Sequence, residues 1–163
     1  MNALIISAVF GVLMMFSSFL LKKNSAVRGI AIAGMIILIA VAIMEMNGVR
    51  LFEVKLRGML SFDRFAMLFI IIALICSLLY ILFSGRDMER VGKGYADYFA
   101  LIFFILCGIM LVASFRSLLI LFLGVEIISI PLYILTGSDK RNLKSNEASL
   151  KYFLMGSFST GLM

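Results

Sequence analysis

Long apolar runs separated by short polar and charged segments are the main pattern along this chain. Six such runs occur, at about residues 3–21, 29–44, 65–83, 98–113, 117–136 and 147–163. A helix needs roughly 20 predominantly apolar residues to cross the hydrocarbon core of a bilayer, and most of the runs approach that length. The pattern therefore predicts an all-α fold, a polytopic transmembrane bundle of about six helices.

The connections between the runs predict which helices are neighbours. Only residues 114–116 separate the fourth run from the fifth, so these two helices should pack as antiparallel neighbours. The connection over residues 45–64 is longer and charged, and its part 49–57 alternates apolar and polar residues like a short strand or hairpin. Asp63 and Asp97 lie at the starts of the third and fourth helices, where a carboxylate stabilises the helix N-terminus.

Composition supports a membrane protein with the lipid bilayer as a partner. Hydrophobic residues make up 63% of the chain and charged residues 15%, whereas soluble domains average about 45–50% and about 25%. Nine Lys and Arg lie in the loops after helices one, three and five, against five after helices two and four. The positive-inside rule then places the N-terminus outside the cytoplasm. Basic residues placed this way indicate orientation in a membrane and not nucleic-acid binding.

The residue types that hold most redox cofactors and metals are scarce. The chain has no His, and its two cysteines, Cys76 and Cys107, lie in different apolar runs without a CxxC pair. Zinc, iron–sulfur and haem ligation therefore lack support, and the sequence lacks a phosphate-binding P-loop. We expect no cofactor or metal to be bound by this chain.

Glu126 is the most informative residue, because it lies near the middle of the fifth apolar run. Charged side chains at the centre of a spanning helix cost about 2.5–3.5 kcal/mol on insertion scales, and those that occur usually serve transport or pair with a buried partner. We interpret Glu126 as a proton-handling group. The alternative is a packing ion pair with a Lys or Arg of a neighbouring helix.

Three further residues of the same helix favour a polar path. Ser129 and Tyr133 follow Glu126 by three and seven residues, which puts all three side chains on one stripe. Pro131 has no N–H, so the carbonyl of Ile127 loses its helical donor and can bind water or another side chain. We therefore expect Ser129, Tyr133 and Pro131 to line a proton path, although Pro131 acting only as a kink stays open.

Lys151 is the second charge inside an apolar run. A desolvated lysine loses its proton readily and regains it beside a carboxylate, so Lys151 is a candidate for proton translocation together with Glu126. Two structural alternatives stay open. The apolar run places Lys151 about one turn inside its helix, where it can extend to the interface, and Glu147 stands four residues earlier at the spacing of a helical ion pair.

The last third of the chain resembles a known family. The segments Leu-Gly-Val-Glu-Ile-Ile-Ser-Ile-Pro-Leu-Tyr, over residues 123–133, and Glu-Ala-Ser-Leu-Lys-Tyr-Phe, over 147–153, are similar to the antiporter-like membrane subunits of respiratory complex I, most of all subunit N. The resemblance implies that Glu126 matches the proton-channel glutamate of the fifth helix and that Lys151 matches a lysine of the sixth. The family's central lysines on later helices lie beyond residue 163.

The resemblance also implies an organisation and partners. The chain would be the N-terminal part of a fourteen-helix fold, with residues 1–95 forming helices one to three and 96–163 starting the first inverted repeat. It would pump protons in the bacterial plasma membrane beside other membrane subunits of complex I, while NADH, quinone, FMN and iron–sulfur clusters act elsewhere in that complex. Two alternatives remain: a subunit of a multi-subunit Na⁺/H⁺ antiporter, and a non-transporting structural subunit.

Overall fold

The computed structural model describes residues 1–20, 24–48, 58–84 and 95–163, and within these it contains six helices. They are α1 (Asn2–Leu20), α2 (Asn24–Met46), α3 (Arg64–Ser84), α4 (Tyr95–Ala113), α5 (Leu118–Thr136) and α6 (Leu143–Leu162). The predicted all-α fold is confirmed, and each predicted run corresponds to one helix. The strand or hairpin expected over residues 49–57 lies outside the described residues.

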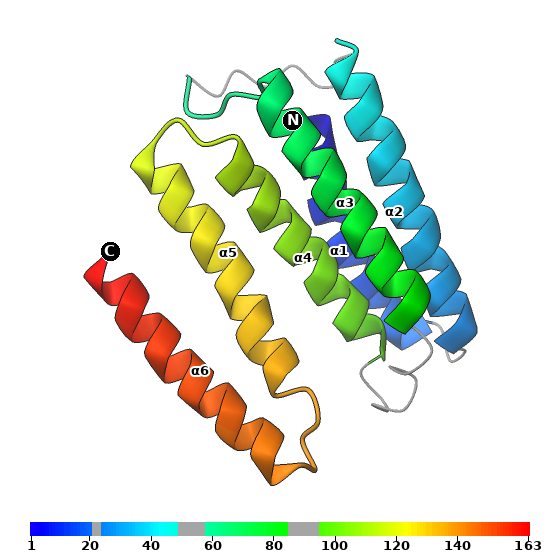
Figure 1. Ribbon diagram of the computed structural model, residues 1–163. Helices are drawn as coiled ribbons and strands as arrows, with labels where there is room; N and C mark the ends of the chain where they lie inside the picture. The colour runs from blue at the N-terminus through cyan, green and yellow to red at the C-terminus, as the bar shows by residue number, and fades with distance from the viewer. Residues whose placement is uncertain (21–23, 49–57, 85–94) are drawn as a thin grey trace.

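The helices lie roughly side by side, with α1 to α4 gathered in a bundle and α5 and α6 extending from it on one side (Figure 1). Helix α4 packs against both α1 and α5, and α6 packs against α5. The fourth and fifth helices are antiparallel neighbours, as the short connection between them predicts (Figure 1). Helix α5 therefore has one side toward the bundle and the other toward α6.

The core is centred on one face of α4. Phe99, Phe103, Leu106 and Met110 follow the alternating spacing of four and three residues that keeps side chains on one helical face, and all four are almost fully buried. The ring of Phe103 stacks on Phe10 of α1 with 5.8 Å between ring centroids. Helix α4 thus packs against α1 on one side, and α5 packs against α4.

Four of the described helices are long and apolar enough to cross a membrane, namely α2, α3, α4 and α5. The described part of α1 is a shorter apolar helix, Asn2–Ser17. Helix α6 falls outside this set, and its first half carries the charged residues Lys144, Glu147 and Lys151. The chain is a multi-pass membrane protein, and its α6 is more polar than the other helices.

A backbone connection ties the start of α5 to the segment before α3. Leu60 and Phe115 form an antiparallel bridge, and the N–H of Ser61 donates to the carbonyl of Ser114 at 2.7 Å. Gly58 begins this segment with a φ of 75°, a conformation that glycine adopts at little cost. Two connections therefore position the N-terminal end of α5: the one that leads from α4 and the segment before α3.

Candidate functional site

Helix α5 packs closely against α4 along one face, so functional side chains of α5 must lie on its other faces. A Cβ atom added to Gly108 of α4 would lie 2.6 Å from Cγ1 of Ile128 and 3.0 Å from the carbonyl oxygen of Gly124. Non-bonded carbon atoms prefer about 3.5–4.0 Å, so only glycine fits here. Gly124 is buried in the same contact. Gly124 and Ile128 thus lie on the face of α5 that packs against α4, and this contact fills that face.

Glu126 lies on the opposite side of α5, in the middle of the helix. It follows Gly124 by two residues, and a rotation of about 100° per residue turns it away from α4. The Glu126 side chain is partly exposed. Among the residues that the structure describes, Glu126 has neither a hydrogen-bond nor an ion-pair partner. A carboxylate in this position has its lone pairs available for a proton, a water or a group from outside the described helices.

Tyr133 lies almost in line with Glu126, because seven residues in a helix return the side chain to within about 20° of its starting direction. Its side chain is 9% exposed and packs on α6. The Tyr133 ring lies edge-to-face with Tyr152, with 4.9 Å between centroids, and with Phe153, with 5.7 Å. The face of α5 that carries Glu126 is therefore the face that meets α6.

Ser129 and Pro131 occupy the stretch between these two residues. The hydroxyl of Ser129 donates to the carbonyl of Val125 at 2.8 Å, so it is engaged with its own helix. Pro131 is buried inside α5 and interrupts the backbone hydrogen bonds there because it has no N–H. Only Pro131 therefore removes a helical hydrogen bond here, the one that the carbonyl of Ile127 would otherwise accept.

Helix α6 contacts α5 through small and hydroxyl-bearing residues. The hydroxyl of Ser145 donates to the carbonyl of Thr136 at 2.7 Å, and that of Ser149 donates to the carbonyl of Tyr133 at 3.0 Å. The least exposed residues of α6 continue this stripe to Gly156 and Thr160. Sequence reasoning missed this stripe, although the spacing of four, seven and four residues is a signal for one helical face.

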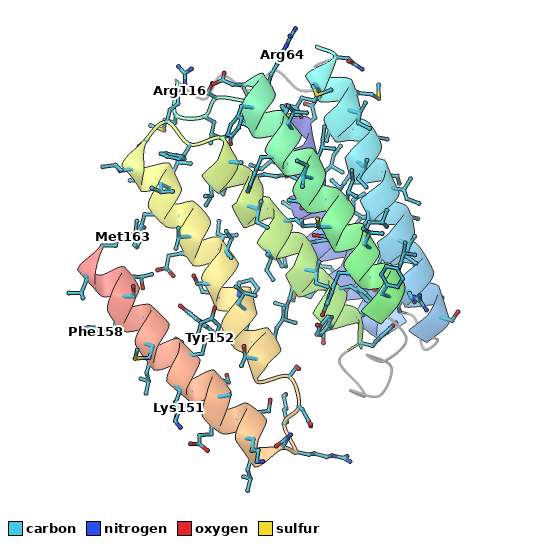
Figure 2. All side chains as sticks on the ribbon, viewed as in Figure 1. Arg64, Arg116, Lys151, Tyr152, Phe158 and Met163 are labelled. Atoms are coloured by element: carbon cyan, nitrogen blue, oxygen red, sulfur yellow. The ribbon has the colours of Figure 1, made fainter. Side chains whose placement is uncertain are left out.

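Lys151 lies on the other face of α6. Figure 2 shows its side chain pointing away from α5, whereas Tyr152 points toward it. The Nζ atom of Lys151 lies 2.6 Å from Oε1 of Glu147, and the Lys151 side chain is 71% exposed. The placement of Lys151 about one turn inside its helix was wrong, because α6 begins at Leu143 and puts Lys151 two turns inside. The structure therefore does not bring Lys151 and Glu126 together.

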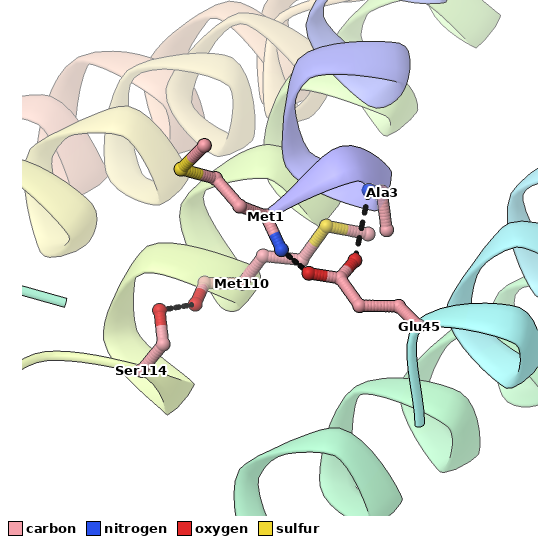
Figure 3. A network of polar contacts seen from close by, with 5 residues as sticks. All are labelled: Met1, Ala3, Glu45, Met110 and Ser114. Carbon is pink, nitrogen blue, oxygen red and sulfur yellow. Dashed lines mark hydrogen bonds and ion pairs between the residues drawn. The ribbon is translucent and has the colours of Figure 1, made fainter. Parts of the chain in front are cut away.

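A further acid, partly buried and assigned to a loop by sequence reasoning, is Glu45 in the last turn of α2. Its carboxylate forms an ion pair with the amino group of Met1 and accepts a hydrogen bond from the N–H of Ala3 at 3.3 Å (Figure 3). A carboxylate at a helix N-terminus satisfies free N–H groups. Glu45 thus stabilises the start of α1 and is separate from the α5–α6 contact.

The chemistry available to this arrangement is proton exchange. Glu126 is the only titratable side chain between Leu118 and Ile130, and no group of three His, Cys, Asp or Glu that suits a metal occurs among the described residues. Hydroxyl groups of Tyr133 and of the serines both donate and accept hydrogen bonds. The contact of α5 with α6, together with Glu126, forms a candidate proton-handling site.

This fold matches one class of membrane protein. The family described as NADH:quinone oxidoreductase/Mrp antiporter, transmembrane, matches residues 115–163, which include α5 and α6. A chain of respiratory complex I from Thermus thermophilus, solved with bound aureothin, superposes with a TM-score of 0.76 at 27% identity. That superposition covers 98% of this chain and 34% of the other.

Within this class, the similar proteins are named NADH-quinone oxidoreductase subunit N. The subunit from Cytophaga hutchinsonii is 36% identical over 166 residues, and that from Flavobacterium psychrophilum is 33% identical over 163 residues. Each alignment covers 100% of this chain and 35% of the relative. The resemblance to subunit N is thereby confirmed, and the chain spans about a third of the length of the curated relatives it matches.

Proposed function

We propose that this chain forms part of a proton-translocating membrane subunit of NADH:quinone oxidoreductase, in which electron transfer from NADH to quinone is coupled to proton pumping. One observation carries the proposal. Glu126 lies in the middle of an apolar helix, faces α6 and has no partner among the described residues. The naming of the relatives as subunit N supports the same function.

A charged carboxylate in an apolar membrane helix raises the free energy of insertion, so a function has to offset that cost. The insertion cost of such a charge is offset when the group exchanges protons with a hydrated path or meets a counter-charge for part of a cycle. Moving one elementary charge across 100 mV takes about 2.3 kcal/mol, so coupling must supply a few kcal/mol per proton. Glu126 is the group that would take up and release that proton.

The other residues have supporting roles in this proposal. Ser129, Tyr133 and the carbonyl left free by Pro131 line the path beside Glu126. Lys151 is a second proton-translocating group, on the face of α6 that points away from α5. It would therefore exchange its partner Glu147 for a group outside the described helices, and its change in charge would act on Glu126 across α6.

We also propose a location, an orientation and partners for the chain in the cell. The chain would lie in a bacterial plasma membrane with its N-terminus outside, because the loops after helices one, three and five carry more Lys and Arg. Residues 1–95 would precede the first inverted repeat, and residues 96–163 would begin it. Other membrane subunits of complex I would be its partners, and the redox cofactors would lie in other subunits.

The test replaces Glu126 by Ala and compares it with Asp139→Asn, a change at an exposed loop carboxylate. NADH oxidation and NADH-driven proton pumping are measured in inverted membrane vesicles, with the amount of assembled complex as the reference. We expect Glu126→Ala to assemble and to lose most pumping, and Asp139→Asn to pump normally. Pumping at the wild-type level in Glu126→Ala would refute the proposal.

Two measurements separate the alternatives. Copurification with an NADH-oxidising complex supports the proposal, whereas Na⁺-dependent proton exchange without NADH would identify a cation/proton antiporter. A structural role for Glu126 predicts that Glu126→Gln reduces assembly of the complex and leaves pumping per assembled complex unchanged. A pumping role predicts the reverse.

A further inference from the structure

Gly156 of α6 receives the tip of the Tyr133 side chain. A Cβ atom added to Gly156 would lie 2.6 Å from Cζ and 2.9 Å from Cε1 of Tyr133, and closer still to the phenol oxygen. Non-bonded carbon atoms prefer about 3.5–4.0 Å, so any side chain at position 156 must displace the phenol. Gly161, five residues further along the same helix, has no atom within 4 Å of such a Cβ.

The phenol is directed toward the part of α5 that carries Glu126. Ser149 of α6 meets the backbone carbonyl of Tyr133, and Gly156, seven residues further along α6, meets its hydroxyl. The two helices run in opposite directions, so the Tyr133 side chain extends toward the N-terminal half of α5 (Figure 1). Helical side chains tilt toward the N-terminus of their own helix, which gives the same direction.

Neighbours on α6 leave the phenol few other positions. Tyr152 and Phe153 hold its ring edge-to-face, at interplanar angles of 89° and 86°. Such aromatic contacts have a preferred geometry and resist sliding of the rings. Because the ring is rigid, its hydroxyl can move only together with the ring, and the space left by Gly156 is where that hydroxyl lies.

We propose that Gly156 is a positioning residue for proton delivery to Glu126. Its missing side chain keeps the Tyr133 hydroxyl between α5 and α6, on the Glu126 side of the contact. There the hydroxyl oxygen takes up a proton from one donor while the hydroxyl gives its own proton to the next acceptor, so one proton passes and the phenol ends neutral. This inference rests on the proposed proton-pumping function.

The first experiment compares Gly156→Ala with Gly161→Ala in the full complex. Both variants make the same change in α6, but only the first displaces Tyr133. We expect Gly156→Ala to reduce the rate of NADH-driven pumping by about tenfold, because misplacement of a reacting group by about 1 Å can lower a rate by as much as about 100-fold. We expect Gly161→Ala to pump as the wild type does. Wild-type pumping in Gly156→Ala overturns the inference.

A second pair of variants separates positioning from packing. Tyr133→Leu shortens the side chain, so it relieves the contact with the methyl group that Gly156→Ala introduces, but it also removes the hydroxyl. We expect the double variant Gly156→Ala/Tyr133→Leu to assemble normally and to pump no better than Gly156→Ala alone. Recovery of wild-type pumping in the double variant overturns the inference, since it would mean that only the steric contact matters.

The pH profile provides a readout that packing alone would not change. Displacement of the hydroxyl alters proton access to Glu126, so the pH dependence of pumping in Gly156→Ala should differ from that of the wild type and of Gly161→Ala. An identical profile in all three counts against the inference. Glu126→Gln is measured alongside: if it pumps normally, the proposed function fails, whereas loss in Glu126→Gln with normal Gly156→Ala refutes only this inference.

Discussion

Lys151 binds Glu147 on the face of α6 that points away from α5, with 2.6 Å between Nζ and Oε1. The pair is exposed, at 71% for the Lys151 side chain and 64% for that of Glu147. Exposed pairs at this helical spacing contribute only about 0.3–0.5 kcal/mol. The pair therefore does little to hold α6 in place, and Lys151 can leave Glu147 at small cost.

This relationship predicts different outcomes for the two partners. Glu147→Gln should leave assembly and pumping near the wild-type level, because it removes only a weak contact. Lys151→Met should assemble but pump less, since it removes a charge that the proposed cycle uses. Proton pumping per NADH oxidised measures both. Equal pumping in Lys151→Met and the wild type would show that Lys151 takes no part in translocation.

The α4–α5 contact predicts a stability effect. Gly124→Ala should destabilise the subunit by about 1–3 kcal/mol, the usual range for overpacking, because the new Cβ would lie 2.7 Å from Cγ2 of Val112. Gly29→Ala on α2 is the control, because nothing lies within 4 Å of its Cβ. The melting temperature of the purified complex and the yield of assembled subunit measure the effect. Equal values for the two variants would contradict this account of the contact.

The hydrogen bonds from α6 to the C-terminal end of α5 predict a smaller effect on stability. Ser149→Ala removes the donor to the Tyr133 carbonyl and should cost about 0.6 kcal/mol, the average for such bonds between membrane helices. Ser159→Ala, at an exposed position of the same helix, should cost nothing measurable. Thermal unfolding of the two variants is compared. A larger loss for Ser159→Ala would show that α6 packs on α5 through a different face.

Replacement of Pro131 should affect the stability of α5 and the rate of proton pumping differently. Alanine at this position restores an N–H to the backbone of α5, so helix stability should be unchanged or higher. Pumping should fall, because the carbonyl of Ile127 would no longer be free for the path beside Glu126. Pumping rates at equal amounts of complex test this. Unchanged pumping in Pro131→Ala would reduce the role of Pro131 to shaping the helix.

The sequence predicted the helices well because apolar runs of bilayer length leave few alternatives. It also predicted that Glu126 and Tyr133 share a face, since helical periodicity is local. The contact of Tyr133 with Gly156 could not be predicted, because it depends on how far α6 is shifted along α5. The depth of Lys151 within its helix was predicted wrongly because α6 begins at Leu143, after the Asn142 side chain, which accepts a hydrogen bond from the N–H of Lys144.

The position and partner of Glu45 also could not be predicted from the sequence. Its place at the end of an apolar run suggested a loop, but α2 continues through it to Met46. The ion pair with the Met1 amino group joins residues that lie far apart in the sequence, and periodicity carries no information on such contacts (Figure 3). Local patterns predicted the elements, and packing determined the partners.

The most direct test of proton handling by Glu126 is the proton-to-electron ratio of the purified complex in proteoliposomes, measured for the wild type and Glu126→Gln. Glutamine keeps the size and polarity of the side chain but cannot exchange a proton at neutral pH. We expect the variant to oxidise NADH and reduce quinone while pumping fewer protons per electron. An unchanged ratio in a fully assembled Glu126→Gln complex would contradict this role.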